Sequence, residues 1–273
     1  MNKKDRTVNL FLEIFLWLCS VVTIYPLLMV VLTAFKVRGE AGYLNIRLPT
    51  VWQFSNFAEV WKYNFLRSLG NSVFVTVISV TLTLSLSSVL SFVLCRRGTR
   101  GARIAYRLMT FGIIAPFAAM PTIQLLRTIG LYGSRLGLSL CYAALFMPFT
   151  TMIFTGFIKG IPRELDEAAV IDGVRGFFLF GRIIFPLLKP VIATAGVLNF
   201  MWVWNELQIP MYLLNSSAKW TLPLSVFNFY GQYSRNWNLV CADVVLVSVP
   251  VVLVYIFAQK YIINGMISGA VKG

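Results

Sequence analysis

The sequence predicts an all-α integral membrane protein with six transmembrane helices, on two observations. The chain of 273 residues is 58% hydrophobic and only 12% charged, whereas a soluble domain of this length carries about 25% charged residues. Apolar runs of about 20 residues also recur along it, and each is long enough to cross a hydrocarbon core of ~30 Å. The predicted structure is therefore a bundle of membrane-spanning helices.

The apolar runs place six spans in a single transmembrane domain that covers residues 1–273. The first run is too long for the apolar core of a cleavable signal peptide, so we expect it to remain as a helix. In the third span, Pro116 and Pro121 can break the helix, and this break either lines a pathway or is a packed kink. The predicted spans are residues 10–35, 71–94, 104–125, 136–158, 191–214 and 239–262.

The charge pattern predicts the orientation of these spans. The formal net charge is +14, which in a soluble protein would suggest a nucleic-acid partner. In a membrane protein, lysines and arginines instead accumulate in cytoplasmic loops. Most of the 24 basic residues lie in the termini, the loop RRGTRGAR and the long loop 159–190. We therefore expect both termini in the cytoplasm, contact with membrane lipid and no nucleic-acid partner.

Several kinds of chemistry are excluded by what the sequence lacks. It has no histidine, and its four cysteines are far apart, so we expect no metal site and no catalytic residue. It also has no GxxxxGK[ST] phosphate loop. Energy for any transport must therefore come from a partner or from an ion gradient.

An acidic helix is predicted in the loop 159–190. Four of the ten acids of the chain fall within RELDEAAVID. Pro162 suits the first turn of a helix, the acids favour its positive end, and Gly173 can end it in the left-handed conformation. We expect a helix of about three turns over residues 161–172.

This helix has apolar side chains on two faces. At 100° per residue Leu165, Ala168 and Ala169 share one side, whereas Val170 and Ile171 lie on the other. A helix that rests on its own protein shows a single apolar face. The pattern favours either insertion into a groove of a second protein or a position at the lipid headgroups.

The same segment resembles the EAA loop of binding-protein-dependent ABC importer permeases. The run EAAVIDG, nine residues and then IIFP matches that loop, with Phe185 in place of leucine. The segments YPLLMVVLTAFK, LGNSVFVTVISV, VWNELQIP and QKYIINGMISGAVKG resemble, in order, the smaller permease subunit of maltose-type carbohydrate importers. The resemblance implies a type I ABC importer permease fold in the cytoplasmic membrane of a bacterium.

The resemblance also implies a coupling role for the loop. The helix would dock into a groove of a cytoplasmic ATPase, Gly173 would allow the turn after it, and Ile183 and Pro186 would return the chain to the membrane. The chain itself would bind no cofactor, because ATP and Mg belong to the ATPase. Implied partners are a second, related permease, two ATPase subunits and an extracytoplasmic sugar-binding protein. The residues expected to contact the ATPase are Arg163, Glu164, Leu165, Glu167, Ala168, Ala169, Asp172 and Gly173.

A substrate contact is predicted in the fifth and sixth spans. A charge at bilayer depth costs ~2.5–3.5 kcal/mol on insertion scales, so such residues face a partner or a wet cavity. Aromatic rings beside amide or carboxylate acceptors suit the two faces of a sugar. Side chains two apart on a helix point in different directions, so the candidate residues named next cannot all face one cavity. Gating or packing between spans is an alternative role for them. The candidates are Trp202, Trp204, Asn205, Glu206 and Asp243.

The predicted function is therefore a permease subunit of an ATP-driven carbohydrate importer, with an oligosaccharide as the expected substrate and no enzymatic activity of its own. It would form half of an alternating-access pathway. The alternatives are a permease of the same type for a non-sugar solute, a self-contained ion-coupled transporter or channel, and a membrane enzyme.

Overall fold

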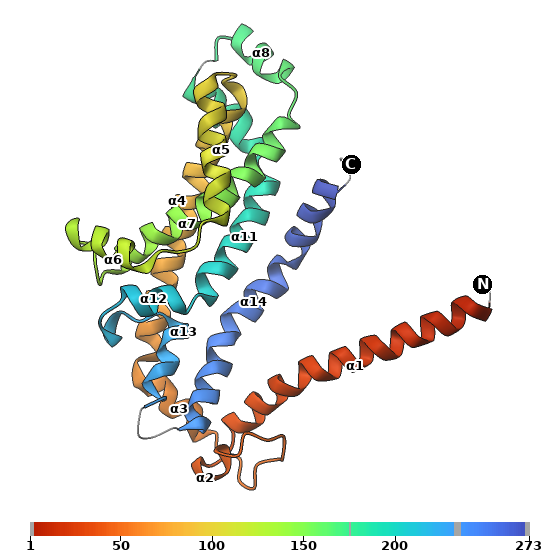
Figure 1. Cartoon of the computed structure of the whole chain (residues 1–273), viewed down its shortest axis with the longest axis vertical. Helices are drawn as coiled ribbons and strands as arrows, with labels where there is room; N and C mark the ends of the chain where they lie inside the picture. Colours follow the sequence, from red (N-terminus) through yellow and green to blue (C-terminus); the bar gives the residue numbers. More distant parts are fainter. Residues whose placement is uncertain (1–2, 175, 232–235, 271–273) are drawn as a thin grey trace. The chain divides into compact units, whose positions relative to one another are not determined.

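A computed structural model describes residues 3–174, 176–231 and 236–270, and no β-strand occurs among them. The prediction of an all-α membrane protein is confirmed (Figure 1). The chain divides into two compact units, one of residues 1–66 and 225–250 and the other of residues 67–224 and 251–273. The two units are described separately below.

Four helical segments in the described residues are long and apolar enough to cross a membrane, and up to six are if each of two bent pairs forms one span. The bent pairs are Arg100–Ile114 with Ala119–Thr128, at 117°, and Phe177–Leu187 with Lys189–Asn205, at 76°. The division into six spans within a single domain stays a prediction. The four continuous segments are Leu12–Ala34, Ser55–Arg96, Arg135–Lys159 and Trp237–Gln259.

The third predicted span is broken. Helix α5 (Arg100–Ile114) ends before Pro116, and α6 (Ala119–Thr128) begins after it. Proline disfavours helical geometry in the residue before it, and Ala115 accordingly has extended backbone angles (φ −67°, ψ 123°). Pro121 lies in the first turn of α6, where a missing amide donor costs little. The bend of 117° is too large for a packed kink in a continuous helix.

The first unit holds α1 (Lys3–Ala34), α2 (Arg38–Ala41), α3 (Ser55–Val60), the 3-10 turn Val226–Asn228 and the first part of α14 (Trp237–Ala270). A buried lysine anchors the segment that follows α1. Lys36 is only 2% exposed, and its Nζ donates to the carbonyl oxygen and to Oδ1 of Asn45, at 2.7 and 2.9 Å. Asn56 donates to the carbonyls of Ala34 and Lys36, so the chain is tied back to the end of α1.

The second unit is built on three long helices, α4 (Leu66–Arg96), α7 (Arg135–Lys159) and α11 (Lys189–Asn205). Shorter elements connect or follow them. These are α8 (Glu164–Ile171), α9 (Phe177–Leu179), the π-helical turn Phe180–Ile184, α10 (Phe185–Leu187), α12 (Gln208–Leu213), the 3-10 turn Ser217–Lys219 and α13 (Leu222–Ser225). The π-helical turn Trp61–Phe65, which precedes α4, belongs to the first unit.

Small polar side chains join α4 to α7 in a regular ladder. Each donor on α4 reaches the backbone carbonyl that lies 60 residues further along the chain, so the two helices are parallel and keep one register. Small residues let helices approach closely in a membrane, and their hydroxyls replace missing water. The ladder consists of Ser79 to Ser139 at 3.3 Å, Ser87 to Met147 at 3.3 Å, Ser91 to Thr151 at 3.0 Å and Cys95 to Thr155 at 3.6 Å.

This close approach predicts that Ser91→Leu destabilises the protein. Ser91 is fully buried, so a larger side chain must push α4 away from α7, and overpacking of this kind costs about 1–3 kcal/mol. Ser91→Ala is the matched control, because it removes only one interhelical hydrogen bond, worth about 0.6 kcal/mol on average in a membrane protein. Thermal unfolding in detergent measures both changes. Equal midpoints for the leucine and alanine variants would contradict the tight α4–α7 contact.

Candidate functional site

The predicted acidic helix is present as α8, and it is shorter than expected. It covers Glu164–Ile171, eight residues rather than three full turns. It begins with the carbonyl of Arg163, which accepts from the backbone amides of Asp166 and Glu167. It ends at Gly173, whose φ of +83° lies in the left-handed region. The amides of Gly173 and Val174 donate back to Val170 and Ala169, which is the Schellman arrangement for a helix end.

The helix α8 buries little of its surface in its own chain. Ala169 is 4% exposed, and it is the buried residue of the helix. Ile171 is 85% exposed, and Leu165 and Val170 are exposed on other sides of the helix. The candidate contact residues Arg163, Glu164, Glu167, Ala168 and Asp172 are exposed as well. A short helix with several uncovered apolar side chains has the surface expected of an element that docks into a partner.

The chain after α8 turns back along its own unit. Gly176 has a second positive φ, of +58°, and Phe180 and Ile184 then insert into a core with Phe154 and Ile158 of α7. Ile183 packs at the edge of this core, whereas Pro186 is exposed within α10. In Figure 1, α8 lies at one end of the second unit, well away from α12 and α13.

A pocket of about 840 Å³ gathers three of the predicted pathway residues, Trp202, Asn205 and Glu206. Its walls are the ends of α5 and α11 and the middle of α7. Trp202 contacts two phenylalanines of α7, with ring centroids 5.4 Å from Phe146 and 4.9 Å from Phe149. The pocket therefore combines an aromatic wall with polar groups at the end of α11.

The polar groups of this pocket also shape the backbone. Oε1 of Glu206 accepts from the amides of Gln208 and Ile209, at 2.8 and 3.2 Å. A carboxylate at this position satisfies the free amides that begin α12. The fifth predicted span, residues 191–214, is accordingly divided between α11 and α12 at Glu206. Asn205 uses one of its two amide N–H groups to donate to the carbonyl of Met201, so its other N–H and its side-chain oxygen are left for a ligand.

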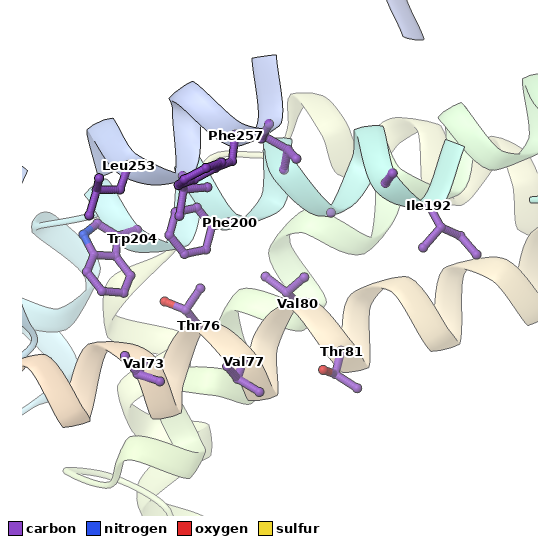
Figure 2. Close-up of a pocket in the computed structure, with 15 residues that line it drawn as sticks. Val73, Thr76, Val77, Val80, Thr81, Ile192, Phe200, Trp204, Leu253 and Phe257 are labelled. Atoms are coloured by element: carbon purple, nitrogen blue, oxygen red, sulfur yellow. The ribbon is translucent and has the colours of Figure 1, made fainter. Parts of the chain in front are cut away.

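Trp204 does not share this pocket. It is 4% exposed and lines a separate, apolar pocket of about 760 Å³ between α4, α11 and the later part of α14. Figure 2 shows Trp204 and Phe200 lying opposite Thr76 of α4. The rings of Phe200 and Trp204 stack at 5.3 Å. Side chains two apart on a helix point in different directions, and Trp202 and Trp204 are placed accordingly.

Asp243 lies in the other compact unit, within α14. It is 1% exposed, and its Oδ2 accepts a hydrogen bond from Ser225 at 3.0 Å. Among the residues that the structure describes, no lysine or arginine forms an ion pair with it. Its hydrogen bond with Ser225 gives Asp243 a partner within its own unit, and Asp243 is not among the residues that line the pocket of Trp202, Asn205 and Glu206.

A contact that the sequence pattern did not indicate joins α8 to α4. Arg96, the last residue of α4, forms an ion pair with Asp166 of α8, with 2.6 Å between Nε and Oδ2. The partners are 70 residues apart, and RRGTRGAR offers several other arginines, so no local pattern singles out Arg96 as the partner.

Several helices long and apolar enough to cross a membrane, with an exposed short helix between two of them, are the features of a polytopic membrane protein. Residues 84–268 match the family described as binding-protein-dependent transport system inner membrane component. The chain belongs to this family of ABC transporter permeases, as its resemblance predicted. It is a membrane component of a transporter, and the alternative of a membrane enzyme is wrong.

Curated relatives match over nearly the full chain. The probable starch degradation products transport system permease protein AmyC of Thermoanaerobacterium thermosulfurigenes is 32% identical, over 93% of this chain and 93% of its own length. The multiple sugar-binding transport system permease protein MsmG of Streptococcus mutans is 31% identical, over 99% of this chain and 100% of its own length. The melibiose/raffinose/stachyose import permease protein MelC of Bacillus subtilis is 33% identical, over 91% of each.

The fold is shared with solved transporters. A chain of a bacterial ABC transporter involved in the import of the acidic polysaccharide alginate superposes with a TM-score of 0.85, at 22% identity and over 96% of this chain and 98% of its own. A chain of the MetNI methionine ABC transporter superposes with a TM-score of 0.58, at 15% identity and over 75% of this chain and 97% of its own. At these identities the likeness establishes the importer permease fold.

Proposed function

We propose that this chain is one permease subunit of an ATP-driven carbohydrate importer, with oligosaccharides as its substrate class. It would form half of an alternating-access pathway with a second, related permease. Two ATPase subunits would bind ATP and Mg in the cytoplasm, where both termini of this chain lie, and an extracytoplasmic binding protein would deliver the sugar. The printed names of AmyC, MsmG and MelC, which refer to sugars or starch products, support the substrate class.

The observation that carries the coupling half of this proposal is the exposed surface of α8. Leu165, Val170 and Ile171 are uncovered apolar side chains on a helix of eight residues. Exposed apolar surface of this kind indicates a partner interface. In the proposed role α8 docks into a groove of the ATPase and transmits the closure of the ATPase dimer to the spans.

The pocket beside Trp202 supports the substrate class. Its lining, as far as the structure describes it, contains aromatic and aliphatic side chains, one carboxylate and no lysine or arginine. Aromatic faces suit the C–H faces of a sugar ring, and the oxygens of Asn205 and Glu206 suit its hydroxyl groups. A carboxylate without a cation repels acidic sugars. We therefore propose uncharged oligosaccharides for this pocket.

Trp202→Ala tests the pocket. An aromatic contact contributes about 0.5–1.5 kcal/mol beyond its buried area, so the KM of uptake should rise by about two- to tenfold. Trp202→Phe should retain most of the wild-type KM, because it keeps an aromatic face. Phe257→Ala is a matched control, since Phe257 is an exposed aromatic residue of the other pocket. Uptake kinetics in proteoliposomes measure all three, and an unchanged KM for Trp202→Ala would contradict the sugar contact.

The substrate class itself is tested by uptake into proteoliposomes that contain the full transporter. Neutral oligosaccharides, uronic-acid oligosaccharides and amino acids are supplied in parallel, each with ATP inside the vesicles. The proposal predicts ATP-dependent uptake of neutral oligosaccharides. Uptake of amino acids alone, or of acidic oligosaccharides in preference to neutral ones, would overturn it.

A further inference from the structure

The ion pair of Arg96 stands where the α4–α7 ladder meets α8. The last ladder contact, from Cys95 of α4 to the carbonyl of Thr155, immediately precedes Arg96. Because the ladder keeps one register from Ser79 onward, α4 and α7 are expected to move as one body. The backbone of Arg96 is therefore held in place by the α4–α7 helix pair. The side chain of Arg96 extends from this helix pair toward the acidic helix α8.

The arginine makes two kinds of contact with the α8 segment. Its Nε lies 2.6 Å from Oδ2 of Asp166, and its Nη2 donates to Oδ1 at 3.2 Å. Its Nη1 and Nη2 also donate to the carbonyl of Ile161, at 3.5 and 3.4 Å. One guanidinium group therefore bridges Ile161, three residues before the start of α8, and Asp166 in the first turn of α8. A planar fork of donors can make these contacts together, whereas a lysine presents a single ammonium group.

The contact is partly shielded from water. The side chains of Arg96 and Asp166 are 14% and 16% exposed, so screening weakens their attraction less than that of a surface pair. Glu164, Glu167 and Asp172 are instead exposed. Among the described residues, Asp166 is the acid of this helix that pairs with a basic side chain of its own chain. The four acids therefore divide into one internal contact and three that remain available to a partner.

We infer that Arg96 is a positioning residue that clasps the coupling helix α8 to the α4–α7 pair through Asp166 and Ile161. The inference rests on the proposed function, in which α8 receives the motion of an ATPase. A docked helix transmits force only if its connection to the spans is stiff. The neighbouring Ile161, at 8% exposure, and Ala169 supply apolar contacts, and the clasp adds a directional one that resists rotation and sliding of α8.

The first test uses Arg96→Gln and Asp166→Asn in the reconstituted transporter. Each variant should keep the ATPase bound but lower the amount of sugar transported per ATP hydrolysed, by about tenfold, within the range of coupling energies between connected sites. Arg96→Lys should transport an amount of sugar per ATP between those of the wild type and Arg96→Gln, because lysine keeps the positive charge but lacks the forked guanidinium donors. Arg97→Gln is the matched control, since Arg97 is the adjacent arginine and is exposed. Wild-type transport per ATP in both clasp variants would overturn the inference.

A charge swap separates positioning from a general structural role. Arg96→Asp combined with Asp166→Arg should recover more transport per ATP than either single change, because it restores an ion pair between the same positions. A double variant no better than the worse single variant would overturn the clasp.

Hydrogen exchange gives a readout that is independent of transport. Arg96→Gln should speed exchange of the amides of residues 164–171 and leave those of α4 and α7 unchanged. Unchanged exchange in α8, or faster exchange throughout the unit, would contradict the clasp. If the wild-type transporter moved sugar without ATP, the proposed function would fail, whereas the exchange result for α8 would still decide the clasp.

Discussion

Gly173→Asp is expected to abolish ATP-driven uptake while the protein still inserts into the membrane and folds. A Cβ built at Gly173 meets nothing within 4 Å, so the chain itself has room for the side chain. Aspartate also tolerates the left-handed conformation better than most residues. The loss should therefore arise in the partner interface, where an unpaired charge costs roughly 2–5 kcal/mol, about 30-fold or more in affinity. Uptake assays and size-exclusion profiles of the purified protein measure the two effects separately.

Two variants control for this change. Gly173→Asn has nearly the same size and conformational tolerance without the charge, so it should retain far more uptake. Gly98→Asp adds the same charge to an exposed loop glycine that also has open space around it, and it should transport normally. Wild-type uptake by Gly173→Asp would show that the turn after α8 lies outside the docking surface.

Ala168→Trp is expected to release the ATPase. Ala168 is exposed on α8, so a large side chain points away from the core of the chain and leaves its stability nearly unchanged. In a groove shaped for alanine the ring has no space, and overpacking of a close contact costs about 1–3 kcal/mol. Co-purification of the tagged permease with the ATPase should fall by about five- to 100-fold, as that range of energies implies.

Arg97→Trp controls for the added ring, because it places tryptophan at an exposed position near the end of α4. This variant should keep the ATPase bound. Equal recovery of ATPase with the two tryptophan variants would contradict the docking of α8 through Ala168, since Ala169 is buried in its own chain.

The helical architecture could be predicted because its signals are local. Apolar runs, the break near Pro116 and the end of α8 at Gly173 each follow from a few neighbouring residues. The division of the fifth predicted span between α11 and α12 could not. It depends on Glu206, whose carboxylate accepts from the amides of Gln208 and Ile209, whereas the sequence alone suggested this acid as a sugar contact or as a gating or packing residue.

The candidate site was predicted in parts, for a similar reason. The exposed residues predicted to contact the ATPase lie together because they share one short helix. Trp202 and Trp204 belong to different pockets, as helical spacing allows, but spacing alone does not reveal which one joins Glu206. The pairing of Arg96 with Asp166 depends on how α8 folds back against α4, and nothing near either residue in the sequence encodes it.

The central claim is that this chain transports sugar only when α8 is coupled to a separate ATPase. Its most direct test is uptake of a labelled neutral oligosaccharide into proteoliposomes that contain this chain, the second permease and the binding protein, with and without the ATPase. The account predicts uptake with the ATPase and internal ATP, and none when either is omitted or when Gly173→Asp replaces the wild type. Concentrative uptake by the chain alone, without ATPase, would contradict it.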